Sequence, residues 1–191
     1  MKNFIRTFIA LKITPEKTLK IAIEKLKHDF AKSPIKWINF DDFHLTLHFL
    51  GEISAENIEK VTKIIHQRAI NLIPFEIEVR GLGAFYKKGH PFVIWAGVKE
   101  HKIMNQLFSE LKADLSLNGF AFENRPFAPH LTLGRIKKKE SPDLLKSTLL
   151  KYEGVLLQKV LIKEIYFYES ILNPSGPVYR ALEIIDLQGI R

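Results

Sequence analysis

Hydrophobic residues recur along the 191-residue chain with two spacings, every second position in some segments and every third or fourth in others. The first spacing, like short continuous apolar runs, is typical of strands, and the second is typical of helices that bury one face. Strands are predicted over residues 4–11, 35–38, 43–50, 75–80, 92–98, 130–136, 158–169 and 178–185. Helices are predicted around residues 19–30, 58–72, 103–115 and 142–151.

Glycine and proline separate these segments. Gly81 and Gly83 predict a turn or bulge after the fourth strand, and the sequence Asn-Pro-Ser-Gly-Pro at 173–177 predicts the last turn. No linker or low-complexity tract divides the chain, and strands and helices alternate in two rounds that end near the same tetrapeptide. The pattern therefore predicts an α+β fold with an internal duplication, formed by one domain over residues 1–191.

The repeated tetrapeptide is His44-Leu45-Thr46-Leu47, which recurs as His130-Leu131-Thr132-Leu133. Each copy lies in a predicted strand, where side chains alternate between the two faces. The His and Thr of each copy therefore share one face, and the Leu residues, with Phe49 in the first copy, are expected on the other. His48 is expected on the same face as His44.

Two such pairs facing each other across a cleft suit reactions at phosphate. One imidazole can take a proton from an attacking water or hydroxyl while the other gives a proton to the departing oxygen. Histidine suits both roles because its pKa is ordinarily about 6.5. The hydroxyls of Thr46 and Thr132 can donate hydrogen bonds to the non-bridging phosphoryl oxygens. We expect no metal or other cofactor, since the motifs lack the carboxylates that a magnesium-dependent phosphoesterase uses.

Composition narrows the class of partner. The chain has 29 Lys and Arg against 21 Asp and Glu, a net charge of +8, which favours anionic partners such as nucleic acid. The absence of Cys excludes disulfides and thiol nucleophiles. No apolar run approaches the roughly 20 residues that span a bilayer, and the N-terminal segment is interpreted as a strand rather than a signal peptide. We therefore expect a cytoplasmic protein without membrane association and, for want of coiled-coil heptads, a monomer.

The same residues allow other interpretations. A single His and Thr on a strand are most often polar groups facing solvent, and only the repetition reverses that expectation. A second interpretation is a non-catalytic RNA-binding protein, although binding alone needs no pair of imidazoles. A third is a metal site of His44, His48 and His130, which is disfavoured because four residues along a strand span about 13 Å.

The paired motifs resemble those of the 2H phosphoesterase superfamily, and the surrounding segments are similar to its RNA 2′,3′-cyclic phosphodiesterase branch, historically called 2′-5′ RNA ligase. The similarity covers nearly the whole chain and follows the family's order. It is carried by RTFIA (6–10), FHLTLHFLG (43–51), GLGAF (81–85), IWAGV (94–98), PHLTLGR (129–135), YES (168–170) and GPVY (176–179).

This resemblance implies a bilobal, duplicated fold in which two antiparallel-sheet lobes with outer helices surround a central cleft, one motif coming from each lobe. It implies hydrolysis of the 2′,3′-cyclic phosphate at an RNA end, tRNA-derived ends included, to a 2′-phosphomonoester. The resemblance also implies the roles of the matching motif positions. His44 is then the proton donor and His130 the proton acceptor, and Thr46 and Thr132 hold the phosphoryl oxygens. Reversible 2′-5′ RNA ligation is an accompanying activity that the resemblance implies. The alternative within catalysis is action on another cyclic nucleotide or a 2′-5′ oligonucleotide.

Three further residues are candidates for substrate binding. Arg135 can clamp a phosphate, but strict alternation puts it on the Leu face, so this role requires a bulge or twist at Gly134. His48 stands where the family frequently has Arg, and it can replace that residue's positive charge only when protonated. The alternative is that His48 takes no part in substrate binding. Phe8 can stack on a base or pack in the core.

Overall fold

The computed structural model describes residues 4–122, 126–137, 142–174 and 176–189. Within these ranges the first half of the chain forms β1 (Phe4–Lys12), α1 (Lys17–Asp29), β2 (Ile35–Trp37), a short 3₁₀ helix η1 (Phe40–Asp42), β3 (His44–Ser54) and α2 (Ala55–Ala69). The second half forms β4 (Phe75–Lys87), β5 (His90–Val98), α3 (Lys102–Leu117), β6 (His130–Ile136), α4 (Pro142–Leu150), β7 (Leu156–Ile162), β8 (Glu164–Asn173) and β9 (Gly176–Asp186).

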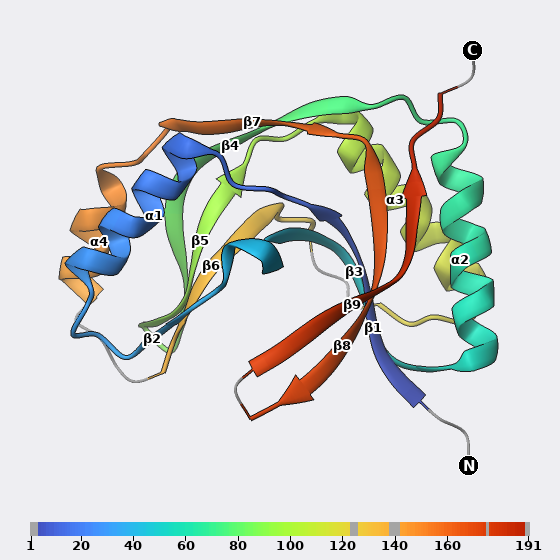
Figure 1. Cartoon of the computed structure of the whole chain (residues 1–191), viewed down its shortest axis with the longest axis horizontal. Helices are drawn as coiled ribbons and strands as arrows, with labels where there is room; N and C mark the ends of the chain where they lie inside the picture. The colour runs from blue at the N-terminus through green and yellow to red at the C-terminus, as the bar shows by residue number, and fades with distance from the viewer. Residues whose placement is uncertain (1–3, 123–125, 138–141, 175, 190–191) are drawn as a thin grey trace.

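The strands of the described residues form one curled antiparallel sheet with the order β7-β4-β5-β6-β3-β1-β8-β9, and β2 pairs with β6. The two motif strands, β3 and β6, meet near the middle of this order through the register pair Leu45 and Leu131. Figure 1 shows α1 and α4 at one end of the molecule and α2 and α3 at the other. The α+β class and the duplicated organisation are confirmed, and the two lobes are halves of a single sheet.

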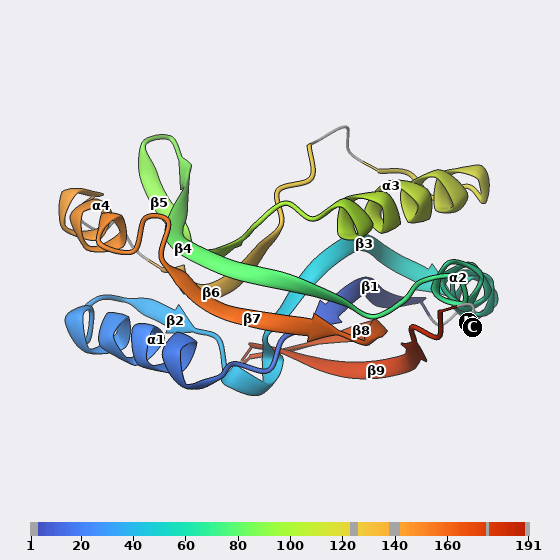
Figure 2. The same cartoon turned by 90° about the horizontal axis from the view of Figure 1, so that it is seen from above.

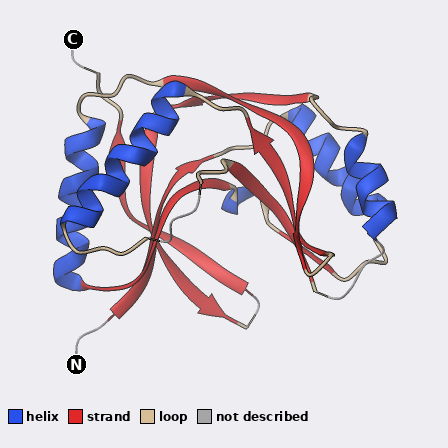
Figure 3. Ribbon diagram, turned by 180° about the vertical axis from the view of Figure 1, so that it is seen from behind, coloured by secondary structure: helices blue, strands red, loops and turns tan. Residues whose placement is uncertain are grey.

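All four helices pack on the same side of this sheet. Their inward-facing apolar residues join Leu45 and Leu131 in one core. The helical members of this core include Leu19, Ile23 and Leu26 of α1, Val61 and Ile65 of α2, Leu107, Leu111 and Leu115 of α3, and Leu145 and Leu149 of α4. A smaller cluster of Phe8, Ala10 and Tyr168 forms apart from it. The distribution of helices around the curved sheet is visible in Figure 3. Among the described residues, no helix is long and apolar enough to cross a membrane.

Several strand boundaries differ from the sequence-based expectation; β3, for example, continues to Ser54 and does not end at Leu50. The two largest differences concern β4 and the predicted strand over 158–169. The fourth strand does not end at Arg80 but continues to Lys87, because the chain passes Gly81 in a bulge that shifts the pairing of β4 with β5. The positive φ of Gly81, 71°, is a backbone conformation that favours glycine. The strand expected over 158–169 is divided at Lys163 into β7 and β8, which pair with β4 and β1 respectively, in different halves of the sheet.

Candidate active site

The register of β3 against β6 brings the two motifs together. Because the strands are antiparallel and Leu45 pairs with Leu131, continuing the register places His44 across from Thr132 and Thr46 across from His130. Leu45 and Leu131 are fully buried in the core, so the His and Thr side chains project from the opposite face. We call this side of the sheet the motif face. All four motif side chains are half-buried there.

Both motif histidines are held by the backbone in the same way. The His44 Nδ1 lies 2.6 Å from the carbonyl oxygen of Asp42, and the His130 Nδ1 lies 2.8 Å from the carbonyl oxygen of Ala128. A carbonyl oxygen can only accept a hydrogen bond, so each Nδ1 carries the proton and donates. In the neutral ring the Nε2 of each histidine is therefore the nitrogen with a free lone pair, available to exchange protons with a substrate.

The two histidines nevertheless have different surroundings. The His44 ring packs against the rings of Phe8 and Tyr179, each with a centroid separation of 5.0 Å. Burial lowers the pKa of His44 below its ordinary value, and the positive charges of Arg135 and His130 lower it further, whereas the hydrogen bond to the Asp42 carbonyl and the Asp42 carboxylate oppose this shift. The unprotonated form of His44 is therefore favoured in the free protein.

Among the described residues, the ring of His130 contacts one other aromatic ring. The ring of Phe85 meets it edge-on at 4.8 Å, and Phe85 in turn lies 5.6 Å from the ring of Trp95. Tyr179 and Phe85 lie in segments that carry the family resemblance, but neither was among the predicted site residues. Nothing in their local sequence predicts contact with a motif histidine, because β9 and β4 reach the motif face through long-range pairing.

Each motif strand contains a β-bulge at the last residue of its tetrapeptide. In β3, Thr46 pairs with Ala10 and His48 with Ile9, which leaves Leu47 without a partner in β1. In β6, Thr132 pairs with Trp95 and Gly134 with Ile94, which leaves Leu133 without a partner in β5. The extra residue reverses the alternation of side chains beyond it.

The bulges turn one further side chain of each strand onto the motif face. Arg135 becomes exposed on this face, so the bulge that a phosphate-binding role requires is present. Burial lowers the pKa of His44 and the positive charge of Arg135 lowers it further, whereas burial raises the pKa of Tyr179 and the same charge opposes that rise. Phe49 occupies the equivalent position in β3, where its ring is 62% exposed and 5.9 Å from that of Phe8. The expectation that Phe49 lies on the Leu face is wrong.

A family model described as "LigT like Phosphoesterase" matches residues 11–95 and again residues 98–179. These two matches together cover most of the chain, one for each motif. The chain belongs to the LigT-like phosphoesterase family.

Curated members of this family are similar over their full length. An RNA 2′,3′-cyclic phosphodiesterase of Thermotoga maritima is 34% identical, with 97% of each chain covered. One of Methanocaldococcus jannaschii is 31% identical over 94% of this chain and 99% of the relative. A crystal structure from Thermus thermophilus superposes with a TM-score of 0.82 at 28% identity, covering 98% of this chain and 100% of that one. The structure of E. coli LigT in apo form, at 23% identity and a TM-score of 0.74, shares the fold over 97% of this chain and 98% of its own.

His48, the second candidate for substrate binding, does not lie beside His44. The bulge turns it into the protein, where it is 4% exposed and stacks on Phe108 at 4.4 Å. Its Nε2 donates a hydrogen bond to the carbonyl oxygen of Phe108 at 2.8 Å. Burial lowers the pKa of His48 to about 4, so the ring is neutral near pH 7. The expectation of a shared face is wrong, and His48 supplies no positive charge to a phosphate.

Phe8 lies beneath the site rather than on its surface. Its ring is 2% exposed and contacts Tyr168 in a stacked arrangement at 5.1 Å as well as His44. Of the two predicted roles of Phe8, stacking on a base and packing in the core, the structure therefore supports packing. Phe8 fixes the ring of His44 from below, and the adjacent exposed ring is that of Phe49.

No three His, Cys, Asp or Glu side chains of the described ranges are grouped as metal ligands, and the burial of His48 separates it from the other two members of the metal site considered above.

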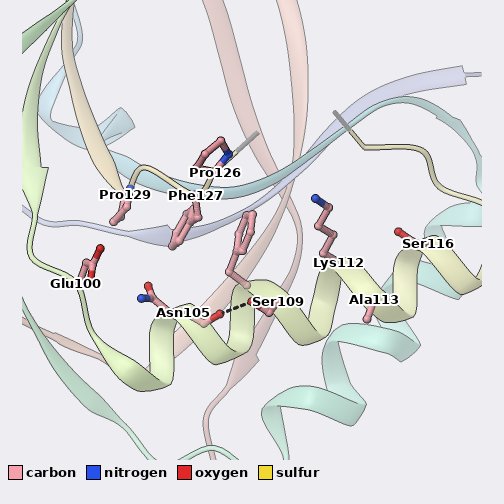
Figure 4. A pocket seen from close by; sticks show the side chains of 10 residues that line it. Glu100, Asn105, Ser109, Lys112, Ala113, Ser116, Pro126, Phe127 and Pro129 are labelled. Atoms are coloured by element: carbon pink, nitrogen blue, oxygen red, sulfur yellow. Dashed lines mark hydrogen bonds between the residues drawn. The ribbon is translucent and has the colours of Figure 1, made fainter. Parts of the chain in front are cut away.

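A hollow of about 580 Å³ runs along α3, with Asn105, Ser109 and Lys112 on one side and the segment from Pro126 to Pro129 on the other (Figure 4). None of the motif residues lines it.

Proposed function

We propose that this protein hydrolyses the 2′,3′-cyclic phosphate at the end of an RNA to a 2′-phosphomonoester. The observation that carries the proposal is the crossed register, in which each motif histidine lies across from the threonine of the other motif. This arrangement surrounds one phosphoryl group with two proton-exchanging nitrogens and two hydroxyl donors. The names of the full-length relatives, RNA 2′,3′-cyclic phosphodiesterases, support the choice of substrate.

In the proposed reaction His130 acts as the base and His44 as the acid. The Nε2 of His130 takes a proton from a water molecule, whose oxygen forms a new bond to phosphorus. The bond between phosphorus and the 3′ oxygen breaks, and the protonated Nε2 of His44 gives its proton to that oxygen. The hydroxyls of Thr46 and Thr132 donate to the non-bridging oxygens, and Arg135 offsets their negative charge.

The asymmetry of the motif face supports this division of roles. At equivalent bulges the strand of His44 presents the exposed ring of Phe49, whereas the strand of His130 presents the guanidinium of Arg135. An aromatic ring is a stacking surface for a nucleobase. The ribose that carries the leaving 3′ oxygen is then on the side of His44, and the attacking water is on the side of His130.

The lowered pKa of His44 is compatible with its role as the acid. In the free protein burial favours the neutral ring. A bound cyclic phosphate is an anion, and a negative charge close to an imidazole raises its pKa. Substrate binding therefore helps to protonate the residue that must donate, while the low intrinsic pKa makes it a strong acid.

The proposed reaction needs no metal, because the two imidazoles supply both proton transfers. A 5′-hydroxyl of a second RNA, taking the place of the water, would form a 2′-5′ linkage, so ligation uses the same groups. The protein acts as a monomer in the cytoplasm. The ends of tRNA fragments are one class of natural substrate.

Phosphorus NMR of a short RNA ending in a 2′,3′-cyclic phosphate, incubated with the protein in excess EDTA, tests the proposal. Conversion to a single 2′-phosphate is the expected result, since it identifies the 3′ oxygen as the leaving group. A 3′-phosphate product would contradict the assigned geometry. A cyclic phosphate that persists with EDTA but disappears after manganese or zinc is added would contradict the metal-free mechanism, and one that persists throughout would favour the binding-only interpretation.

A further inference from the structure

The hairpin that joins β4 to β5 extends the motif face beyond the site. Pairing of β5 with β6 ends at Val93 and Arg135, so residues 85–92 continue past β6 as a two-stranded projection. Figure 2 shows this hairpin standing out from the rest of the sheet. We call residues 85–92 the hairpin tip. Its base is Phe85, whose ring contacts the His130 ring, so the tip is continuous with the site.

The hairpin tip carries an aromatic surface that leads away from His130. The ring of Phe92 lies 6.5 Å from that of Phe85 and is 41% exposed. Phe92 occupies a bulge, since Phe85 pairs with Val93 and Tyr86 with Pro91. The rings of Phe85 and Phe92 therefore form a short row that begins at a catalytic histidine and ends in solvent.

The same tip is positively charged, and its two lysines are not offset by an ion pair with a carboxylate of the described residues. These lysines, Lys87 and Lys88, are both exposed. No Asp or Glu occurs anywhere between Glu78 and Glu100. The turn at Lys88 and Gly89, with φ angles of 50° and 76°, is tight and projects the two lysines from the end of the hairpin.

Exposed lysines beside exposed aromatic rings form the kind of surface that binds single-stranded nucleic acid. The cations attract backbone phosphates, and the rings stack on bases whatever their identity. We infer that the hairpin tip binds the part of the substrate RNA that precedes its reacting nucleotide, so that the RNA crosses the motif face from the ribose beside His44 to the tip beside His130. This inference rests on the proposed function and names the surface that makes a long RNA a better substrate than an isolated nucleotide.

Length dependence of the reaction tests the inference. The substrates are a mononucleoside 2′,3′-cyclic phosphate and a single-stranded RNA of twelve nucleotides with the same end. The variants are K87E/K88E and Phe92→Ser. The matched control is K17E/K25E, which makes the same change of net charge on exposed residues of α1, a helix that packs on the other side of the sheet.

The wild-type protein is expected to give a higher kcat/KM for the twelve-nucleotide RNA than for the mononucleotide. K87E/K88E and Phe92→Ser should each lower kcat/KM for the long RNA about tenfold or more while that for the mononucleotide stays within a factor of two. Loss of two phosphate contacts should also make the slope of log kcat/KM against log salt concentration less negative by about 1.4. Each phosphate contact to a single strand contributes about 0.7 to that slope. The control K17E/K25E should change neither kcat/KM for the two substrates nor its dependence on salt.

Equal effects of the tip variants on both substrates would overturn the inference, as would a length dependence that survives in them. Wild-type turnover of neither substrate would contradict the proposed function instead. Fluorescence anisotropy with the twelve-nucleotide RNA ending in a 2′-phosphate then tests the tip separately. Weaker binding by K87E/K88E than by K17E/K25E is the expected result, and equal binding by the two would overturn the inference.

Discussion

Leu45 and Leu131 are the register partners through which the two halves of the sheet meet, and both are fully buried. This single pairing determines which motif residues are neighbours on the opposite face. A shift of the register by one residue would move every motif side chain to the other side of the strand. The pairing of Leu45 with Leu131 therefore determines both the packing in the core and the arrangement of the His and Thr side chains on the motif face.

Removal of either motif imidazole should abolish most of the activity. His44→Ala and His130→Ala should each lower kcat by about 10²–10⁴, because each loses one proton transfer, while binding of the RNA product changes little. Single-turnover kinetics and anisotropy measure the two effects. His28→Ala, an exposed histidine on α1, is the matched control and should leave kcat unchanged. Near wild-type turnover in either motif variant would refute the acid–base assignment.

The motif threonines should affect the rate without setting its pH dependence. Thr46→Val and Thr132→Val remove a hydroxyl donor at nearly constant volume, and each should lower kcat by up to about 10³. Their pH–rate profiles should keep the wild-type shape, because both imidazoles remain. Thr62→Val on α2 controls for the loss of a hydroxyl elsewhere. Full activity in the double variant Thr46→Val, Thr132→Val would remove the proposed role.

How far the sequence predicts this site depends on what the local pattern contains. The repeat and the alternation around Leu45 and Leu131 predicted the shared face of the His and Thr residues. The same alternation gave the wrong face for His48 and Phe49, because a bulge depends on pairing with β1, which the strand's own sequence does not encode. For Arg135 the sequence predicted a role only with a bulge or twist at Gly134, and the structure has a bulge at the preceding residue, Leu133.

The aromatic neighbours of the two motif histidines could not be predicted from the local sequence pattern. Tyr179 reaches His44 because β9 pairs with β8 and β8 with β1, and Phe85 reaches His130 because β4 pairs with β5. Strand order over such sequence separations cannot be read from hydrophobic spacing. The division of residues 158–169 into β7 and β8 was missed for a related reason, since both halves are apolar and only their different partners distinguish them.

Arg135 should control the protonation of His44. Its positive charge is one of the causes that lower the pKa of His44, so Arg135→Gln should raise that pKa toward 6.5. NMR titration of the His44 imidazole measures the change in the free protein. Lys25→Gln, an exposed residue of α1, removes a charge on the other side of the sheet and should leave the His44 pKa unchanged. A lower or unchanged pKa in Arg135→Gln would contradict the electrostatic contact.

His48 should make folding stability depend on pH. Its pKa is about 4 in the folded protein and about 6.5 when unfolded, so between these values the unfolded chain binds more protons. The free energy of unfolding should therefore fall as pH decreases from 6.5 to 4, by up to about 3 kcal/mol from this residue. Urea denaturation across this range measures it. His48→Gln keeps a donor for the Phe108 carbonyl and should show a smaller fall; a fall as large as in the wild type would contradict the assignment.

The most direct test of the two-imidazole mechanism replaces the 3′ oxygen of the cyclic phosphate with sulfur. A thiolate is a weak base and departs without a proton, so the reaction no longer needs a general acid but still needs a base. Turnover of this substrate by His44→Ala should approach that of the wild-type protein, while His130→Ala should remain slow. Restoration in His130→Ala instead would exchange the two roles, and a slow reaction in both variants would contradict His44 as the proton donor.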